Sequence, residues 1–213
     1  MCIRDSTRGV GVLSRKYNLP VYATEGTWEG MAEKVGAVDA CRRCMLVPEQ
    51  DFYIGEMNIT PFSTPHDANQ PVGLSFECRG ARFSIATDVG CIKRGWFGHV
   101  SGSDAVLLES NYDPDMLQAG SYPYALKHRI LSNRGHLCNE DAGRCAAELV
   151  KAGARHIILG HLSKENNFPE LARRCTEDAL RASGIVPGED VRLDVASRDG
   201  VTGIFGISCG FGR

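Results

Sequence analysis

The sequence predicts an α/β domain in which helices pack on the faces of a sheet. Two apolar runs, at residues 105–111 and 155–161, are continuous, as expected for strands that are buried on both faces. Helical segments alternate with these strands, which is typical of α/β domains. The 213 residues, of which 43% are hydrophobic, are enough for one domain with a sizeable core.

The first predicted helix comes before Pro20, which ends it because the residue before a proline is restricted to extended backbone. Val10, Leu13 and Tyr17 recur at spacings of three and four residues, so they would share one face of this helix. A strand and a second helix are predicted next, at residues 21–24 and 28–35.

From Asp51 onward the pattern changes to strands. Residues 51–65 contain two short β runs with a turn near Gly55, and residues 72–90 predict a hairpin that turns at Arg79-Gly80. The remaining predicted helices cover residues 113–119, 124–131, 139–152 and 169–183. The remaining predicted strands cover residues 105–111, 155–161, 191–196 and 203–208.

Charge and cysteine content narrow the class of protein. The formal net charge of -2 gives no overall basic footprint for nucleic acid, although a local patch or a bound metal could supply positive charge. No apolar run approaches the ~20 residues of a membrane span. The nine scattered cysteines indicate reduced thiols and a cytoplasmic protein. Cys41 and Cys44 form a lone CxxC, which favours ordinary thiols over a zinc or redox site.

Several polar residues follow apolar β runs, where open α/β sheets present ligand sites. They are His66, Asp88, Glu109, Asn111 and His161, and His136 lies in a loop before a helix. Imidazole and carboxylate groups suit zinc or manganese, and two such ions can activate water and clamp a phosphodiester. The wide spacing of these residues leaves ordinary hydrogen-bonded histidines as an open alternative.

Five segments, taken in order, resemble the later motifs of the metallo-β-lactamase superfamily. They are STPHDANQPVG, SIATDVG, LLESNYDPDML, RGHLCNEDA and ILGHLSKENN. They are most similar to the YycJ/WalJ-like branch, which is related to ribonuclease Z and to phosphonate-pathway phosphodiesterases. The resemblance runs from about Thr7 to the C-terminus and implies an αββα sandwich, incomplete at the N-terminus.

The resemblance also implies roles for particular residues. His66 and His161 match metal-binding histidines, and Asp88 matches the aspartate that bridges two metals. His136 resembles a histidine that protonates the leaving group, and Glu109 resembles the carboxylate that orients it. Further residues are expected to shape the site or contact the substrate: Asp67, Asn111, Ser163, Lys164, Asn166 and Asn167.

A basic cluster allows two interpretations. Lys127, His128, Arg129 and Arg134 lie between two tyrosines, Tyr122 and Tyr124, and His136. The cations could contact phosphates while the tyrosines stack on bases, as on surfaces that bind single strands. The cluster could equally be a solvated helix face.

Two departures from the family pattern affect these expectations. Cys138 replaces a common serine, which keeps a small side chain at that position. The HxHxDH motif, expected just before Thr7, is missing, and residues 1–6 (MCIRDS) resemble a foreign leader. Residues 7–213 are therefore expected to be a partial domain that binds metal weakly, has little activity and exposes an apolar sheet face.

The function expected for the intact parent is a metal-dependent hydrolase that uses two divalent ions, zinc or manganese. The branch implies a DNA exonuclease acting on single-stranded DNA, with no membrane partner and an undetermined oligomeric state. One alternative is a small-molecule phosphodiesterase, or a thioester or lactone hydrolase, with the same fold. Another is a non-catalytic regulatory protein.

Overall fold

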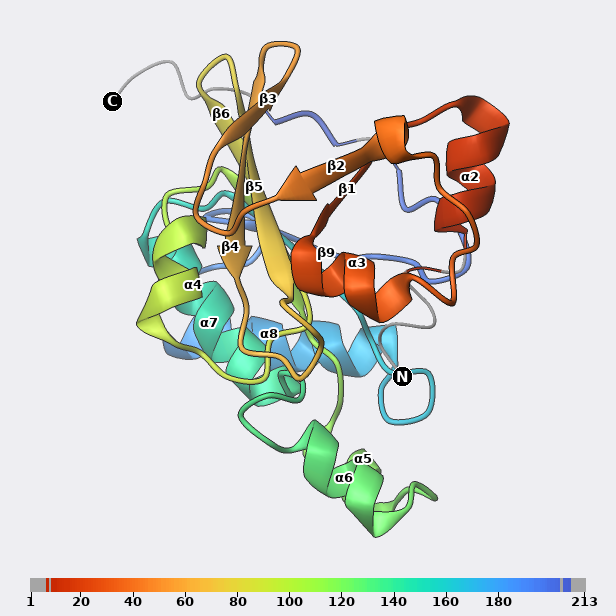
Figure 1. The fold of residues 1–213 in the computed structure, drawn as a ribbon. Helices are drawn as coiled ribbons and strands as arrows, with labels where there is room; N and C mark the ends of the chain where they lie inside the picture. The colour runs from red at the N-terminus through yellow and green to blue at the C-terminus, as the bar shows by residue number, and fades with distance from the viewer. Residues whose placement is uncertain (1–6, 8, 204, 208–213) are drawn as a thin grey trace.

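The computed structural model describes residues 7, 9–203 and 205–207, so the expected leader at residues 1–6 lies outside the described residues. A seven-stranded sheet dominates the fold (Figure 1). Its strands, in spatial order, are β3 (Phe52–Ile54), β4 (Met57–Ser63), β5 (Val72–Cys78), β6 (Ala81–Ala86), β7 (Ala105–Glu109), β8 (His156–Gly160) and β9 (Arg192–Val195). A separate parallel pair consists of β1 (Val21–Thr24) and β2 (Arg43–Leu46).

The direction of the strands determines which strand ends lie at the same edge of the sheet. Strands β3 to β6 are antiparallel, and β6 to β9 are parallel. Strands β4, β6, β7 and β8 therefore all end at the same edge of the sheet. Residues that follow these four strands are brought together there, although up to about a hundred positions separate them in the sequence.

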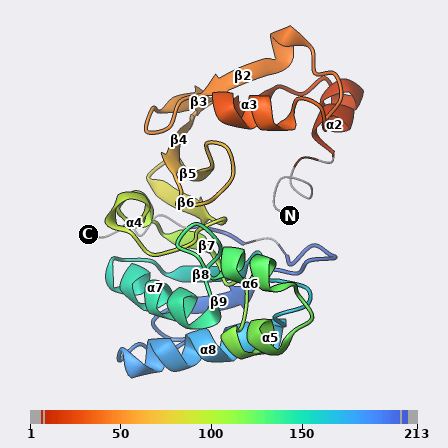
Figure 2. The ribbon, with the colours of Figure 1, turned by 60° about the horizontal axis from the view of Figure 1, so that its bottom comes forward.

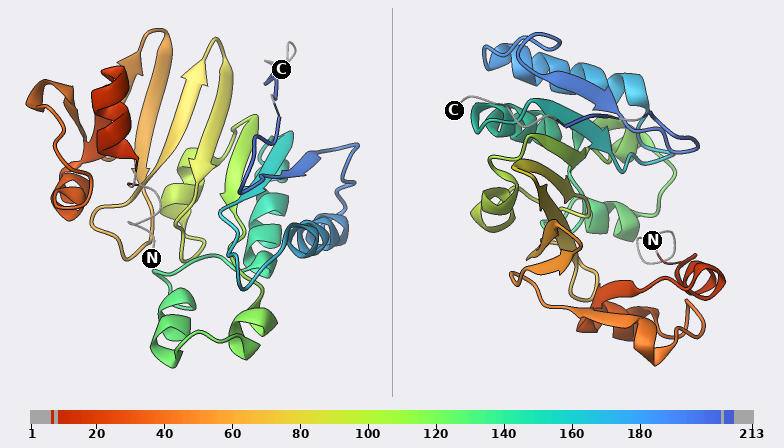
Figure 3. Two further views of the ribbon diagram at one scale, coloured as in Figure 1. Left: turned by 90° about the vertical axis from the view of Figure 1, so that its right-hand side faces the viewer. Right: turned by 90° about the horizontal axis from the view of Figure 1, so that it is seen from above.

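Helices cover one face of this sheet. The described helices are α2 (Val10–Tyr17), α3 (Glu25–Met31), η1 (Ala40–Arg42), α4 (Arg94–Val100), α5 (Pro114–Ala119), α6 (Tyr124–Ile130), α7 (Asn139–Lys151) and α8 (Pro169–Ala182). Helices α4, α7 and α8 lie on one face of the sheet (Figure 3). They share one core with β7 and β8, in which Leu108, Leu149 and Leu180 are fully buried. Helices α5 and α6 extend beyond the end of the sheet, at the bottom of Figure 1.

The opposite face of the sheet is less well covered. Side chains alternate between the faces of a strand, so Leu107 points away from the helix-covered core that contains Val106 and Leu108. The cross-strand pairs Leu74–Ile85 and Phe76–Phe83 lie on β5 and β6, and all four of these side chains are half-buried. Figure 2 shows β2 with α2 and α3 as a separate unit, apart from α7 and α8.

Most predicted elements are confirmed. The hairpin turns at Arg79-Gly80, where both residues have the positive φ that tight two-residue turns require. The continuous run in β7 is almost fully buried, as expected. The second predicted helix lies slightly earlier, at α3.

The structure departs from the sequence pattern at two places. In α2, Leu13 and Tyr17 are 50% and 56% exposed, because the helix instead buries Gly11 and Ser14. An added Cβ at Gly11 would lie 1.8 Å from the carbonyl oxygen of Val35, so close backbone packing determines the orientation of this helix. The predicted strand at 203–208 is absent from its described residues, 203 and 205–207.

Among the helices that the structure describes, none has the length and apolar character needed to cross a membrane.

Candidate metal centre

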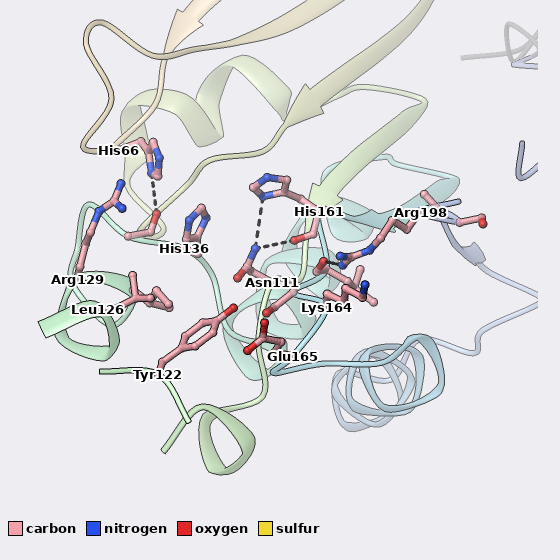
Figure 4. Close-up of a pocket in the computed structure, with 16 residues that line it drawn as sticks. His66, Asn111, Tyr122, Leu126, Arg129, His136, His161, Lys164, Glu165 and Arg198 are labelled. Atoms are coloured by element: carbon pink, nitrogen blue, oxygen red, sulfur yellow. Dashed lines mark hydrogen bonds between the residues drawn. The ribbon is translucent and has the colours of Figure 1, made fainter. Parts of the chain in front are cut away.

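The three sequence-predicted metal ligands converge at the shared edge of the sheet. His66 follows β4, Asp88 follows β6 and His161 directly follows β8. Asp88 Oδ1 lies 3.4 Å from His66 Nε2 and 3.8 Å from His161 Nε2. Figure 4 shows His66 and His161 on either side of His136.

These atoms fit a divalent ion. Zinc binds ligand atoms at about 2.0–2.2 Å, so two ligands of one tetrahedral ion lie roughly 3.3 Å apart. The separation of His66 Nε2 and Asp88 Oδ1 is close to this value. Asp88 Oδ1 is also buried, with no hydrogen-bond partner among the described residues. A buried carboxylate oxygen needs a donor or a cation, and an ion between these groups would supply one.

The backbone at two of these candidate ligands is strained. Asp88 and His161 adopt left-handed conformations, with φ of 56° and 57°. Such conformations are uncommon outside glycine and cost about 1–3 kcal/mol each. The surrounding structure holds both residues in conformations that turn their side chains toward each other. Strain of this kind is concentrated at functional sites.

Glu109 links two of the histidines. Its Oε1 accepts hydrogen bonds from Nδ1 of His136 at 2.6 Å and Nδ1 of His161 at 2.8 Å, and its Oε2 accepts one from the backbone N–H of Val89 at 2.7 Å. Because a carboxylate can only accept, both imidazoles carry a proton on Nδ1. Glu109 is fully buried, and these three donors offset the cost of burying its charge.

Strand register explains why these groups meet. Glu109 pairs with Gly160 across β7 and β8, which puts it next to His161. A parallel bridge between Tyr112 and Cys138 then draws the loop containing His136 alongside β7. Cys138 Sγ also caps α7 by accepting a hydrogen bond from the backbone of Asp141 at 3.4 Å, as a serine would.

The hydrogen bonds determine the ionisation of this cluster. Burial alone would raise the pKa of Glu109, but the hydrogen bonds from His136 and His161 outweigh it and lower the pKa to about 2. Burial would lower the pKa of His161, but its hydrogen bond to Glu109 raises it overall. Glu109 is therefore ionised at neutral pH and holds both imidazole rings in fixed orientations.

His66 is oriented by a different segment. Its Nδ1 donates to the carbonyl oxygen of Gly135 at 2.8 Å, which directs Nε2 toward Asp88. Arg134 donates from Nε and Nη2 to the carbonyl oxygen of His66, at 3.2 and 3.1 Å. Asp67 forms a two-pronged ion pair with Arg129, which lowers the pKa of the Asp67 carboxyl group.

A pocket of about 670 Å³ opens beside this centre (Figure 4). His66, His136 and His161 lie along it. Residues on and before α6 line it, namely Tyr122, Leu126, Arg129 and Ile130. The loop after β8 and the segment after β9 line it as well, including Leu162, Ser163, Lys164, Glu165, Ala196, Ser197 and Arg198.

The other predicted residues fall into two groups. Asn111, Ser163 and Lys164 line the pocket, and Asn111 Nδ2 donates to the carbonyl oxygen of His161 at 2.6 Å. Asn166 and Asn167 are buried and do not line it. They hold the loop in place, since Ser163 Oγ accepts from the backbone of Asn166 at 3.2 Å and Asn167 bonds to buried groups behind the site.

The residues of the basic cluster do not all fit one of the two interpretations. Arg129 lines the pocket, and Arg134 supports His66. Lys127 donates to the carbonyl oxygen of Gln118 at 2.7 Å, and His128 contacts Tyr124 on the same helix, so neither lines the pocket.

Sequence reasoning missed several supporting residues. Ser110 Oγ donates to Asn139 Oδ1 at 2.7 Å, and Asn167 Nδ2 donates to the same oxygen at 2.8 Å. This buried network fixes the turn that follows Glu109, the last residue of β7. Arg198 in the pocket was also missed, and no motif in the sequence marks it.

Comparisons with known proteins agree with this architecture. Residues 4–162 match the family described as the Beta-lactamase superfamily domain. The chain is 37% identical over 185 residues to "Exodeoxyribonuclease YycJ" of Bacillus anthracis, covering 87% of this chain and 70% of that protein. It is 36% identical over 200 residues to "Exodeoxyribonuclease WalJ" of Streptococcus pneumoniae, covering 93% and 74%.

Solved structures share the fold at low sequence identity. The metallo-β-lactamase fold protein YhfI from Bacillus subtilis superposes with a TM-score of 0.64 at 17% identity, covering 88% of this chain and 69% of that one. A diphosphatase from the PhnP family superposes with a TM-score of 0.58 at 16% identity, covering 95% and 66%. With the family match over most of its length, this chain belongs to the β-lactamase superfamily and has the metallo-β-lactamase fold.

Proposed function

We propose that this protein is a metal-dependent phosphodiesterase that degrades DNA from an end. The observation that carries the proposal is the convergence of His66, Asp88 and His161 beside the hydrogen-bonded pair of His136 and Glu109. The relatives named exodeoxyribonucleases, at 36–37% identity, support DNA as the substrate.

His66, Asp88 and His161 are the proposed ligands of divalent ions, zinc or manganese. Bound ions of this kind supply Lewis-acid chemistry, which makes water a nucleophile near neutral pH and offsets phosphate charge. The hydrogen bond from Nδ1 of His161 to Glu109 supports this role. It leaves Nε2, the nitrogen directed at Asp88, with the lone pair that a ligand requires.

His136 is the proposed general acid. The hydrogen bond to Glu109 uses the Nδ1 proton of His136, so in the imidazolium form the second proton is on Nε2, which would deliver it to the departing oxygen of the DNA. Glu109 acts as a positioning residue, because it fixes the tautomer and ring orientation of His136 without lining the pocket. General acids placed in this way typically contribute about 10²–10⁴-fold to the rate.

The size of the pocket supports a single-stranded substrate. Sites for small ligands have volumes of roughly 300–1,000 Å³, and this pocket of about 670 Å³ lies in that range. An unpaired nucleotide at a DNA end fits such a volume, whereas a paired end would have to fray first. The same volume also favours the alternative of a small-molecule phosphodiester, thioester or lactone.

A cleavage assay with matched histidine variants tests the proposal. The purified protein, with excess Mn²⁺ or Zn²⁺, is incubated with end-labelled single-stranded DNA. His136→Ala is expected to lower the rate of cleavage by about 10²–10⁴-fold. His128→Ala is the matched control, because the His128 ring contacts Tyr124 on α6 and does not line the pocket.

The outcomes separate the alternatives. Cleavage of bis-p-nitrophenyl phosphate with no cleavage of DNA would favour the small-molecule hydrolase. Bound metal without cleavage of either substrate would favour the non-catalytic regulatory protein. Equal activity of the His136→Ala variant and the wild type would refute the role assigned to His136.

The proposed compartment is the cytoplasm. Nuclease function supports it, as do the free thiols of the described cysteines.

A further inference from the structure

We infer that Tyr122 binds a nucleobase of the substrate, next to the phosphodiester at the metal centre. This inference rests on the proposed function and deepens it, because it assigns the part of the pocket that recognises the base. If Tyr122 stacks on a base, the protein should bind DNA more tightly than a phosphodiester that lacks a base.

The wall that contains Tyr122 is apolar and rigidly supported. Tyr122, Leu126 and Ile130 line the pocket and are half-buried. Tyr122 and Ile130 pack from behind against a buried cluster that includes Tyr112 and Leu117. Figure 4 shows the Tyr122 ring extending into the pocket, with its hydroxyl toward Asn111. A ring fixed on one side and open on the other is the arrangement that stacking on a base requires.

The opposite wall suits a phosphate backbone. Lys164 and Arg198 line the pocket on the side of His161, and both belong to exposed segments. The lining includes three Lys or Arg side chains and one acidic side chain, Glu165. A ligand that satisfies both walls needs an anionic part near the histidines and a flat apolar part on Tyr122. A nucleotide has both parts.

A neighbouring tyrosine provides a matched comparison. Tyr124 is 77% exposed, and its ring packs edge-on against His128 with the centroids 4.6 Å apart. Its hydroxyl lies 2.7 Å from His128 Nε2. Tyr124 does not line the pocket, so the same substitution there changes the helix surface without changing the pocket wall.

Binding experiments with two oligonucleotides test the inference. Metal is removed with EDTA so that nothing is cut, and affinity is measured by fluorescence anisotropy. One single-stranded oligonucleotide carries normal bases, and the other has abasic sugars at its terminal positions. Tyr122→Leu is expected to weaken binding of the first by roughly 5- to 150-fold, the range for losing one base–aromatic stack. Its binding to the second should be unchanged.

Two further variants and a spectroscopic signal strengthen the test. Tyr122→Phe keeps the ring and should bind within about twofold of the wild type, since stacking needs only the π face. Tyr124→Leu should bind like the wild type. Terminal 2-aminopurine should lose fluorescence on binding the wild type and regain it with Tyr122→Leu. Circular dichroism checks that each variant is folded.

Each contrary result has a distinct meaning. If Tyr122→Leu weakens both oligonucleotides equally, or if the wild type binds both with equal affinity, the inference is overturned while DNA remains a substrate. If 2-aminopurine is not quenched by the wild type, stacking is also overturned. If the wild type binds neither oligonucleotide, the inference is overturned, and the cleavage assay with Mn²⁺ or Zn²⁺ decides separately whether DNA is a substrate.

Discussion

Glu109 combines two demands that usually conflict, because it is both fully buried and ionised. Removing a carboxylate from water costs several kcal/mol unless donors replace the lost hydration. His136, His161 and the backbone of Val89 supply three donors at 2.6–2.8 Å. One carboxylate therefore orients a proposed acid and a proposed metal ligand together, so its loss should affect stability as well as the site.

Substituting Glu109 should destabilise the metal-free protein. Glu109→Gln keeps the size of the side chain but loses the charge that faces two Nδ1 donors. We expect the free energy of unfolding at pH 7 to fall by about 3 kcal/mol, as when one partner of a buried pair is removed. Urea unfolding monitored by circular dichroism measures this change. The control is Glu148→Gln, an exposed residue that pairs with Lys151 and should change stability by less than about 0.5 kcal/mol.

The free energy of unfolding of Glu109→Gln should also depend less on pH in acid than that of the wild type. The pKa of Glu109 lies near 2 in the folded protein and at its usual 4.5 in the unfolded chain. A lowered folded-state pKa gives stability that is fully present above 4.5 and is lost as the pH falls toward 2. The wild type should therefore lose this part of its stability over that range, and Glu109→Gln should not. Parallel profiles for the two proteins would contradict the assignment.

At the scale of elements, the loop after α6 is attached to the loop after β4. Arg134 and Gly135 both bond to His66, and Arg129 pairs with Asp67. The loop is also tightly packed against the end of α6, because an added Cβ at Gly135 would lie 2.0 Å from the carbonyl oxygen of Ile130. Helix α6, which lines the pocket, is therefore held in a fixed position relative to His66, a proposed metal ligand.

Removing one attachment should loosen this segment without unfolding the protein. Arg134→Ala deletes the two hydrogen bonds to the His66 carbonyl oxygen. We expect faster amide hydrogen exchange in residues 124–135 and unchanged exchange in α7, because local opening is governed by local contacts. The control is Arg144→Ala on α7, whose side chain is 69% exposed. Unchanged exchange in residues 124–135 would show that the attachment contributes little.

Local patterns predicted most elements but not their mutual arrangement. The continuous apolar runs at β7 and β8 and the turn at Arg79-Gly80 follow from burial and backbone preference, which are local properties. The buried face of α2 does not, because a glycine contact with Val35 outweighs the apolar spacing of Leu13 and Tyr17. Tertiary packing decides such cases, and it leaves no mark in a short window of sequence.

The candidate site, too, could be predicted from the sequence only in part. His66, Asp88 and His161 could be selected because each follows an apolar run, and strand direction alone brings such positions together. The double contact of Glu109 could not be predicted, because it depends on the register of β7 against β8. The sequence also could not distinguish Tyr122, which lines the pocket, from Tyr124, which does not, because that difference depends on how α6 packs.

At the scale of the whole molecule, the two faces of the large sheet differ. The face toward α4, α7 and α8 is fully packed, whereas Phe76, Phe83, Ile85 and Leu107 on the other face are half-buried. The rings of Phe76 and Phe83 stack with centroids 6.1 Å apart, which makes a flat apolar surface. Contiguous apolar surface of this kind promotes association in water.

This face should therefore control self-association of the purified chain. Phe83→Thr introduces a β-branched side chain suited to a strand while removing the aromatic surface. We expect the variant to bind less 8-anilinonaphthalene-1-sulfonate and to show a smaller concentration-dependent rise in mass by light scattering. Tyr53→Thr is the matched control, since Tyr53 is 68% exposed on the edge strand β3, outside this face. If Tyr53→Thr lowers association and Phe83→Thr does not, association occurs through the sheet edge, where unpaired backbone groups recruit a second chain.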